Sequence, residues 1–214
     1  FGPPWRLRTC MAIVIDVLDL VGNKKRLPVE AFFVDANVVI DYADPFGRSL
    51  GVSFSRQNKE TTEAMHALKS QHKSLSLLAT AMEYYKYIQV GYYRIITNSP
   101  KFDDLDFKYR RTSDASFSAG WTLQLKKFTR LFTKTFPLAE PKIAGTELFG
   151  DFDGTKTDFG DHVLFRNVQV MEPYRRCVFS NDADFYEYPD TIQLLTMNGS
   201  ILKRATKDGK MFQE

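Results

Sequence analysis

The sequence predicts an α/β fold, specifically a three-layer α/β/α sandwich with a mostly parallel central sheet and an inserted helical segment. Short apolar, β-branched runs alternate along the chain with stretches of helical periodicity. The run at residues 31–34 is apolar at every position, which is typical of a parallel strand buried on both faces. With 214 residues, 43% of them hydrophobic and 26% charged, the chain can bury a sizeable core.

The N-terminal part of the chain is expected to alternate strands and helices. Thr80 and Glu83 have the spacing of a capping box, so a helix is expected to begin there. We expect strands at residues 11–21, 31–34 and 74–79, and helices at residues 36–43, 57–69 and about 80–98. Residues 1–10 precede Met11 and are set aside as an N-terminal extension or expression remnant, which leaves residues 11–214 as a single domain.

The C-terminal part contains the predicted insertion, at about residues 100–158. Residues 101–120 are polar and irregular, and residues 145–160 form a loop rich in glycine and aspartate. A basic and polar tail follows Gly199. We expect helices at residues 121–136 and 161–173, and strands at residues 177–180 and 191–197.

The composition excludes several classes of protein. Cys10 and Cys177 form no CxxC pair, and the three histidines are scattered, so any metal should be held by oxygen ligands. The low cysteine content indicates a reducing, cytoplasmic compartment. Because no apolar run approaches the ~20 residues of a membrane span, no transmembrane helix is expected. The net charge of +3 tolerates a nucleic-acid partner without demonstrating one.

Five acidic residues follow predicted strands or open predicted helices. In open α/β sheets, ligands bind outside the carboxyl ends of the strands, where such side chains can converge. Converging carboxylates repel one another, and a divalent cation relieves that repulsion; all-oxygen ligands favour Mg²⁺ or Mn²⁺. Such a cation activates water for attack on a phosphodiester. The five residues are Asp35, Glu83, Asp161, Asp182 and Asp184.

Four segments resemble, in order, the motifs of PIN-domain nucleases. They are FFVDANVVID at residues 32–41, LATAME at 78–83, FGDHVL at 159–164 and CVFSNDADF at 177–185. The resemblance implies a PIN-like fold and a metal-dependent nuclease, most often an endoribonuclease. Many bacterial members are toxins held by an antitoxin protein, so a cognate antitoxin and homo-oligomerisation are further expectations.

The resemblance also assigns roles to individual residues. It implies that Asp35, Glu83, Asp161 and Asp182 are catalytic and bind the metal, and that Asp184 is an auxiliary metal ligand. It further implies that Asn37 and Ser180 orient these acids.

Alternatives to this interpretation stay open. Asp35 could simply cap a helix, and Glu83 could be only a capping-box partner. Asp158 and Asp153 compete with Asp161 for the same role. A DNA nuclease and a catalytically silent PIN-like module that binds RNA or protein are the alternative functions. The phosphatase motif DxDGT at residues 151–155 lacks the buried strand that it requires and is set aside.

The predicted helix at residues 121–136 carries four basic residues and no acid. Their spacing places them on one helix face, opposite phenylalanines that repeat at helical spacing. This face is either solvated or a track for an RNA backbone running towards the acids. The four residues are Lys126, Lys127, Arg130 and Lys134.

Overall fold

The computed structural model describes residues 13–23, 27, 29–43, 46, 56–143, 145–150, 152, 158–187 and 192–212. The strands are β1 (Ile13–Asp16), β2 (Ala31–Val34), β3 (Lys73–Leu75), β4 (Cys177–Phe179) and β5 (Gln193–Thr196). The longer helices are α2 (Ala36–Ala43), α3 (Arg56–Lys69), α4 (Leu78–Thr97), α5 (Asp104–Ser113), α6 (Ala115–Arg130), α8 (Phe159–Gln169) and α10 (Gly199–Lys207). Shorter helical segments are α1 (Val17–Gly22), η2 (Leu131–Thr135), α7 (Gly145–Gly150), η3 (Pro173–Arg175) and α9 (Asp184–Glu187).

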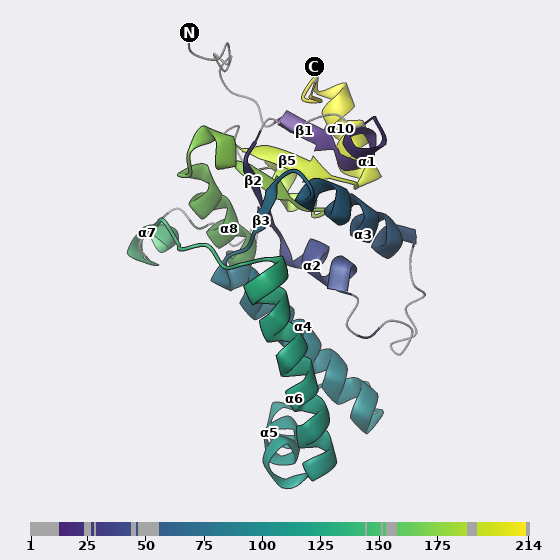
Figure 1. Ribbon diagram of the computed structural model, residues 1–214. Coiled ribbons are helices and arrows are strands. Elements are labelled where there is room, and N and C mark those ends of the chain that lie inside the picture. The colour runs from purple at the N-terminus through teal and green to yellow at the C-terminus, as the bar shows by residue number, and fades with distance from the viewer. Residues whose placement is uncertain are drawn as a thin grey trace.

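All five strands are parallel, in the order β1-β5-β4-β2-β3 (Figure 1). From β2 the chain moves outward to β3, and from β4 it moves outward in the opposite direction to β5. The direction of winding therefore reverses between the two neighbouring strands β2 and β4. Such a reversal opens a crevice at the carboxyl ends of the strands, where ligands of open α/β sheets bind.

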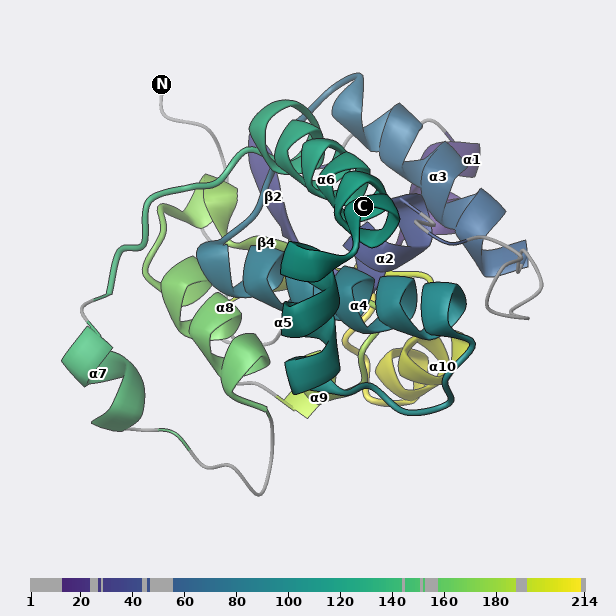
Figure 2. The ribbon, with the colours of Figure 1, turned by 90° about the horizontal axis from the view of Figure 1, so that it is seen from below.

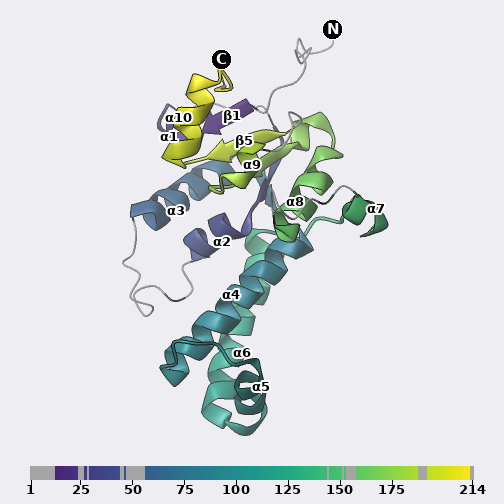
Figure 3. The same ribbon diagram turned by 180° about the vertical axis from the view of Figure 1, so that it is seen from behind.

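Helices cover both faces of the sheet, because successive side chains of β2 point to opposite faces and all of them are buried. Phe32 and Val34 of β2 pack on one face with α2, α3 and α4. Phe33 of β2 packs on the other face with α8, α9 and α10. Figure 3 shows the sheet between α2 and α3 on one side and α8 on the other. The predicted α/β class and parallel sheet are thus confirmed.

The helices α4 and α6 run away from the sheet as a pair, with α5 packed at their far end (Figures 1 and 2). We call residues 78–135 the arm. It is held by aromatic contacts: Phe128 and Phe132 pack against Tyr84, which confirms the expected apolar face of residues 121–136. Farther out, an added Cβ at Gly120 would collide with the hydroxyl group of Tyr92, so glycine allows the two helices to approach closely.

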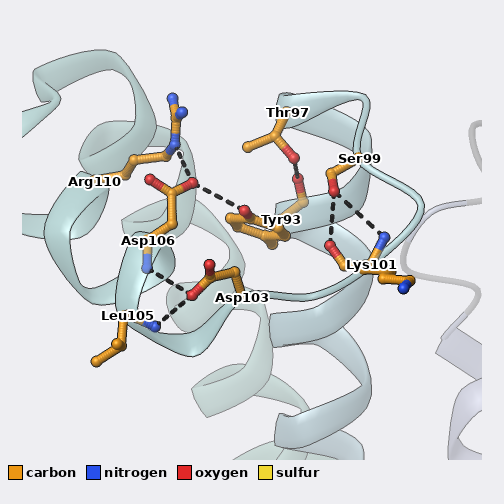
Figure 4. Close-up of polar contacts among 8 residues, drawn as sticks. All are labelled: Tyr93, Thr97, Ser99, Lys101, Asp103, Leu105, Asp106 and Arg110. Carbon is orange, nitrogen blue, oxygen red and sulfur yellow. Dashed lines mark hydrogen bonds and ion pairs between the residues drawn. The ribbon is translucent and has the colours of Figure 1, made fainter.

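The outer end of the arm has its own small core and polar network. The ring of Phe107 lies 5.1 Å from that of Trp121, and both side chains are buried. Figure 4 shows Asp106 accepting hydrogen bonds from the Tyr93 hydroxyl (2.9 Å) and from Nε of Arg110 (2.7 Å). Asp103 caps the start of α5 through the backbone amides of the next turn. The outer end of the arm is therefore stabilised by its own core and hydrogen bonds and is not an irregular loop.

Two predicted strands are shorter than expected. The strand predicted at residues 11–21 ends at Asp16, because the Asp16 carboxylate accepts hydrogen bonds from two backbone amides and starts α1. The strand predicted at residues 74–79 ends at Leu75, and Leu78 already begins α4. The predicted Thr80 cap is wrong: Thr80 lies inside α4, and its hydroxyl donates to the carbonyl of Val34 instead.

The predicted irregular segment at residues 101–120 is also wrong, since it forms α5 and the first part of α6. The prediction failed because α5 has only one buried residue, Phe107, so its sequence is polar and shows no repeating apolar face. Within the loop predicted at residues 145–160 there is a short helix, α7. The helix predicted at residues 161–173 is shifted and runs from Phe159 to Gln169.

The remaining predictions about organisation are only partly covered. The proposed N-terminal extension, residues 1–10, lies outside the described residues, as does the phosphatase-like motif except for Phe152. None of the described helices combines the length and the hydrophobicity needed to cross a membrane.

The aromatic core of the arm predicts a sharp difference between two neighbouring substitutions. Phe107→Ala should destabilise the protein by about 3–5 kcal/mol, because it empties a fully buried site. Leu105→Ala, at a position that is 77% exposed, should change stability by no more than about 0.5 kcal/mol. Urea denaturation followed by circular dichroism measures both. Equal effects of the two substitutions would contradict the existence of this core.

Candidate active site

Asp35 lies directly after β2, at the carboxyl edge of the sheet, and its side chain is only 4% exposed. Its Oδ1 accepts a hydrogen bond from the amide of Ala36 at 2.6 Å. Its Oδ2 accepts from Nδ2 of Asn37 at 2.6 Å and from Oγ of Ser180 at 2.7 Å. Three donors therefore fix this carboxyl group in one orientation.

The turn after β4 meets Asp35 across the crevice between β2 and β4. Ser180 donates to Asp35 and accepts from the amide of Asp182 at 2.9 Å, so one hydroxyl group links the two acids. Asn37 contributes a second link, because its Oδ1 accepts from the amide of Asn181. Asn37 and Ser180 thus both contact Asp35, and their role in orienting a metal-binding acid stays a prediction.

Glu83 reaches the same edge from the second turn of α4. The hydrogen bond from Thr80 to the carbonyl of Val34 (3.3 Å) ties the start of α4 to the end of β2. Helical spacing places Glu83 about one turn beyond Thr80. The start of α4 is therefore held against the residue that precedes Asp35.

Two aspartates at the start of α8 complete the acidic group. Asp158 caps α8, its Oδ1 accepting from the amide of Asp161 at 2.9 Å. A Cβ added at Gly160 would lie 3.2 Å from Oδ1 of Asp158 and 3.3 Å from Oε2 of Glu83. The glycine therefore leaves room for these two carboxyl groups to approach each other from α8 and α4.

The electrostatics confirm that these carboxyl groups share one environment. Burial, together with the charges of Glu83 and Asp182, raises the pKa of Asp35 to about 7, against the opposing hydrogen bonds from Ser180 and Ala36. Burial raises the pKa of Asp161 to about 9, and the neighbouring carboxylates Asp35, Asp158, Asp182 and Glu83 add to that rise. The five groups, which we call the acidic cluster, are Asp35, Glu83, Asp158, Asp161 and Asp182.

Burial and neighbouring carboxylates also raise the pKa of Glu83, which is less buried than Asp35. Its carboxyl group is partly desolvated, and the charges of Asp158 and Asp182 raise its pKa further, whereas Lys86 lowers it. Lys86 is the only cation that influences the raised pKa values of Asp35, Glu83 and Asp161 within the described residues. The acidic cluster therefore has a large excess of negative charge to neutralise.

The donor chemistry of the acidic cluster fits Mg²⁺ or Mn²⁺, since every side chain offers oxygen. In the described part of the chain, however, no three His, Cys, Asp or Glu side chains are already grouped as a metal-binding set. Carboxylate side chains can rotate, and mutual repulsion keeps them apart when no cation is present. The residues therefore fit the ion chemically, although they do not form a ready-made coordination shell.

Two further sets of predicted site residues are Asp184 and the four basic residues of the arm. Asp184 begins α9, and its amide donates to Oδ1 of Asp182 at 3.0 Å. The role of Asp184 as an auxiliary metal ligand stays a prediction. The basic residues Lys126, Lys127, Arg130 and Lys134 are all exposed and lie on α6 and η2, which pack against α4. Whether they bind RNA stays a prediction.

The sequence signalled Asp158 only as a competitor of Asp161, and the structure places both in the cluster. The spacing Asp-x-x-Asp at a helix start could have shown this, because a capping residue and the third residue of the helix lie on the same side of its first turn. Asp153 lies outside the described residues. His162 is buried, with Nε2 3.0 Å from the carbonyl of Leu148, so it fastens α7 to α8.

Comparison with models of known protein families, with curated proteins and with solved structures finds no match to this chain.

The raised pKa values predict how stability depends on pH when metal is absent. In the folded protein Asp35 and Asp161 still hold protons above pH 3.8, their ordinary pKa, which the unfolded chain has released. Stability in EDTA should therefore fall from about pH 4 upward, with the loss due to Asp35 complete near pH 7 and the loss due to Asp161 complete near pH 9. Asp161→Asn has no proton to lose, so its stability should fall less steeply over this range and should level off near pH 7 rather than near pH 9.

Thermal melts in EDTA across this pH range measure the effect. Asp104→Asn is the matched control, because Asp104 lies on α5 and pairs with Lys108 far along the arm. Melting temperatures of wild type and Asp161→Asn that decline in parallel would contradict the raised pKa of Asp161.

Proposed function

We propose that this protein is a Mg²⁺- or Mn²⁺-dependent nuclease that hydrolyses phosphodiester bonds, with RNA as its substrate. The observation that carries the proposal is the acidic cluster at the reversal point between β2 and β4. Five carboxyl groups from β2, β4, α4 and α8 gather there, and three of them have raised pKa values. Perturbed carboxyl groups at such a crevice are candidates for a functional site.

The cost of this arrangement argues against a purely structural role. A carboxyl group that only caps a helix needs no more than local backbone donors. Asp16 and Asp103 are examples in this chain, because each accepts hydrogen bonds from backbone amides of the next turn. Asp35 is instead buried and surrounded by further acids, which lowers stability at neutral pH unless a cation is bound. A bound divalent cation would offset that repulsion.

Asp35, Glu83, Asp158, Asp161 and Asp182 are the residues that would hold the metal, which supplies Lewis-acid activation of water and stabilises charge on the phosphate. Asn37 and Ser180 hold the Asp35 carboxyl group in place through the hydrogen bonds described above. An unmetallated Asp35 with a pKa of about 7 can also accept a proton near neutral pH. Asp184 remains a proposed auxiliary ligand.

The resemblance of four segments to PIN-domain motifs supports RNA as the substrate and a PIN-like variant of the α/β fold. The exposed cations of α6 and η2 support it too, since an acidic centre repels phosphates and needs positive charge nearby to bind nucleic acid. A DNA nuclease and a silent RNA- or protein-binding module are the alternatives. A cognate antitoxin, homo-oligomers and a cytoplasmic location stay predictions.

The proposal predicts metal-dependent cleavage that requires Asp35. The wild-type protein should cut RNA with Mg²⁺ or Mn²⁺ and should be inactive in EDTA. Asp35→Asn should lower the rate by at least ~10²-fold, because an amide is a poorer ligand and cannot balance the charge of the cation. Labelled RNA and DNA of one sequence, resolved on denaturing gels, provide the measurement.

Asp104→Asn again serves as the control and should cleave at the wild-type rate. Equal activity of wild type and Asp35→Asn, in preparations purified identically, would refute the role of Asp35. Faster cleavage of DNA than of RNA would select the DNA nuclease, and RNA binding without any cleavage would select the silent module.

Metal binding should also be visible without activity. A ligand that binds only the folded state stabilises it by RT ln(1 + [L]/Kd), so Mn²⁺ at about 100 times its Kd should add about 2.7 kcal/mol. The increase in melting temperature should be greatly reduced in Asp35→Asn and in Asp161→Asn. Calorimetry with Mn²⁺ measures the affinity directly. No calorimetric signal and an unchanged melting temperature at saturating Mn²⁺ would exclude the metal site.

A further inference from the structure

A pocket of about 410 Å³ lies where the arm leaves the domain. Its walls come from α2, α3, α4 and α6 with η2, and Figure 2 shows these helices side by side. The volume falls near the lower end of the range of ~300–1,000 Å³ that is usual for small-molecule sites. The pocket therefore has room for one compact ligand.

The lining combines flat apolar surfaces with a few polar groups. Tyr42 and Leu131 are half-buried and offer aromatic and aliphatic surface, whereas Tyr84 and Ile88 lie at the almost fully buried base of the pocket. Gln124 and Lys127 lie together on the α6 side of the pocket. Such a lining suits a planar heteroaromatic ring, which packs between aromatic and aliphatic side chains and forms hydrogen bonds at its edge.

Two lysine residues place positive charge at the pocket. Lys127 is exposed, and in the described part of the chain it forms no ion pair. Nζ of Lys69 lies 5.9 Å from the centre of the Tyr42 ring, which adds a second cation beside the aromatic wall. The side-chain amide of Gln124 offers both a donor and an acceptor, which can match the polar edge of a nucleobase.

We infer that this pocket binds one unpaired nucleotide, with the base between Tyr42 and the aliphatic wall and the phosphate at Lys127. The substrate strand is then single-stranded at this point, because a paired base is not available to a pocket. This inference rests on the proposed function only in taking the nucleotide to be part of an RNA substrate. Binding of a free nucleotide by the pocket does not depend on catalysis.

The position of the pocket suits a substrate that reaches the acidic cluster. Tyr84 lines the pocket, and the preceding residue, Glu83, belongs to the cluster. Successive residues of a helix point about 100° apart, so α4 presents the pocket and the acids on neighbouring faces. A strand held in the pocket can thus cross α4 to the acids.

Binding of small probes in EDTA tests the pocket separately from cleavage. Uridine and adenosine 5′-monophosphates, the two nucleosides and ribose 5-phosphate are titrated and followed by heteronuclear NMR. The monophosphates should shift the side-chain amide of Gln124 and should bind at least about tenfold more tightly than either the nucleosides or ribose 5-phosphate, because only they fill both halves of the site.

Two variants and one matched control localise the binding. Lys127→Gln should weaken monophosphate binding by about tenfold or more, through loss of a charge-assisted contact. Ala43→Phe places a ring in the pocket, which Ala43 lines, and should abolish binding without a change in charge. Lys126→Gln removes the same charge from the adjacent exposed residue, which is not part of the lining, and should have little effect.

The outcomes separate this inference from the proposed nuclease function. Equal weakening of monophosphate binding by Lys126→Gln and Lys127→Gln would show that the phosphate is attracted by a diffuse basic face and not by the pocket. No monophosphate binding by a protein that cleaves RNA would overturn the pocket and leave the nuclease intact. Binding that Ala43→Phe and Lys127→Gln remove, in a protein that cleaves nothing, would support the pocket and reject the nuclease. Melting temperatures verify that each variant is folded.

Discussion

The hydrogen bond from Ser180 to Asp35, at 2.7 Å, joins the two central strands at the point where the sheet reverses its direction of winding. It connects residues 145 positions apart in the chain, so it forms only when β2 and β4 are correctly paired. Because Asp35 is buried, the free energy of leaving its oxygens without donors would be large. The turn after β4 is therefore tied to the end of β2, and Asp182 follows it.

The hydrogen bond between Ser180 and Asp35 holds together a region where the negative charges of several carboxylates repel one another. The same burial that makes the Ser180 bond strong raises the pKa of Asp35, and the surrounding acids raise it further. Local donors stabilise single carboxyl groups but do not supply the positive charge that the cluster lacks. The arrangement sacrifices stability at one edge of an otherwise apolar, close-packed sheet, which is the pattern expected where function rather than folding selects the residues.

The arm is fixed to the sheet by separate hydrogen bonds at its two ends. Thr80 anchors the start of α4 to β2. Ser74 of the edge strand β3 donates to the carbonyl of Thr135 at the end of the arm, and Ser76, just after β3, donates to the carbonyl of Phe136, which follows the arm. Both ends of the arm are thus fixed to the sheet, while its outer part is stabilised by its own aromatic packing. The pocket and the acidic cluster lie on neighbouring faces of the first turns of α4, so their relative position follows from this anchoring.

The sequence by itself determined the features that depend on local pattern. The all-apolar run at residues 31–34 predicted a buried parallel strand, and the D-x-N and S-x-D spacings predicted acids at strand ends, because strand period and turn chemistry are encoded within a few residues. Local polarity failed at residues 101–120, where a helix contributes one buried side chain to a core made by others. The tertiary structure alone decided that Asp158 joins Asp161, and that Tyr42, Tyr84 and Lys127 meet at one pocket. These outcomes depend on how distant segments pack and on the burial that packing creates, and neither quantity is present in any short stretch of sequence.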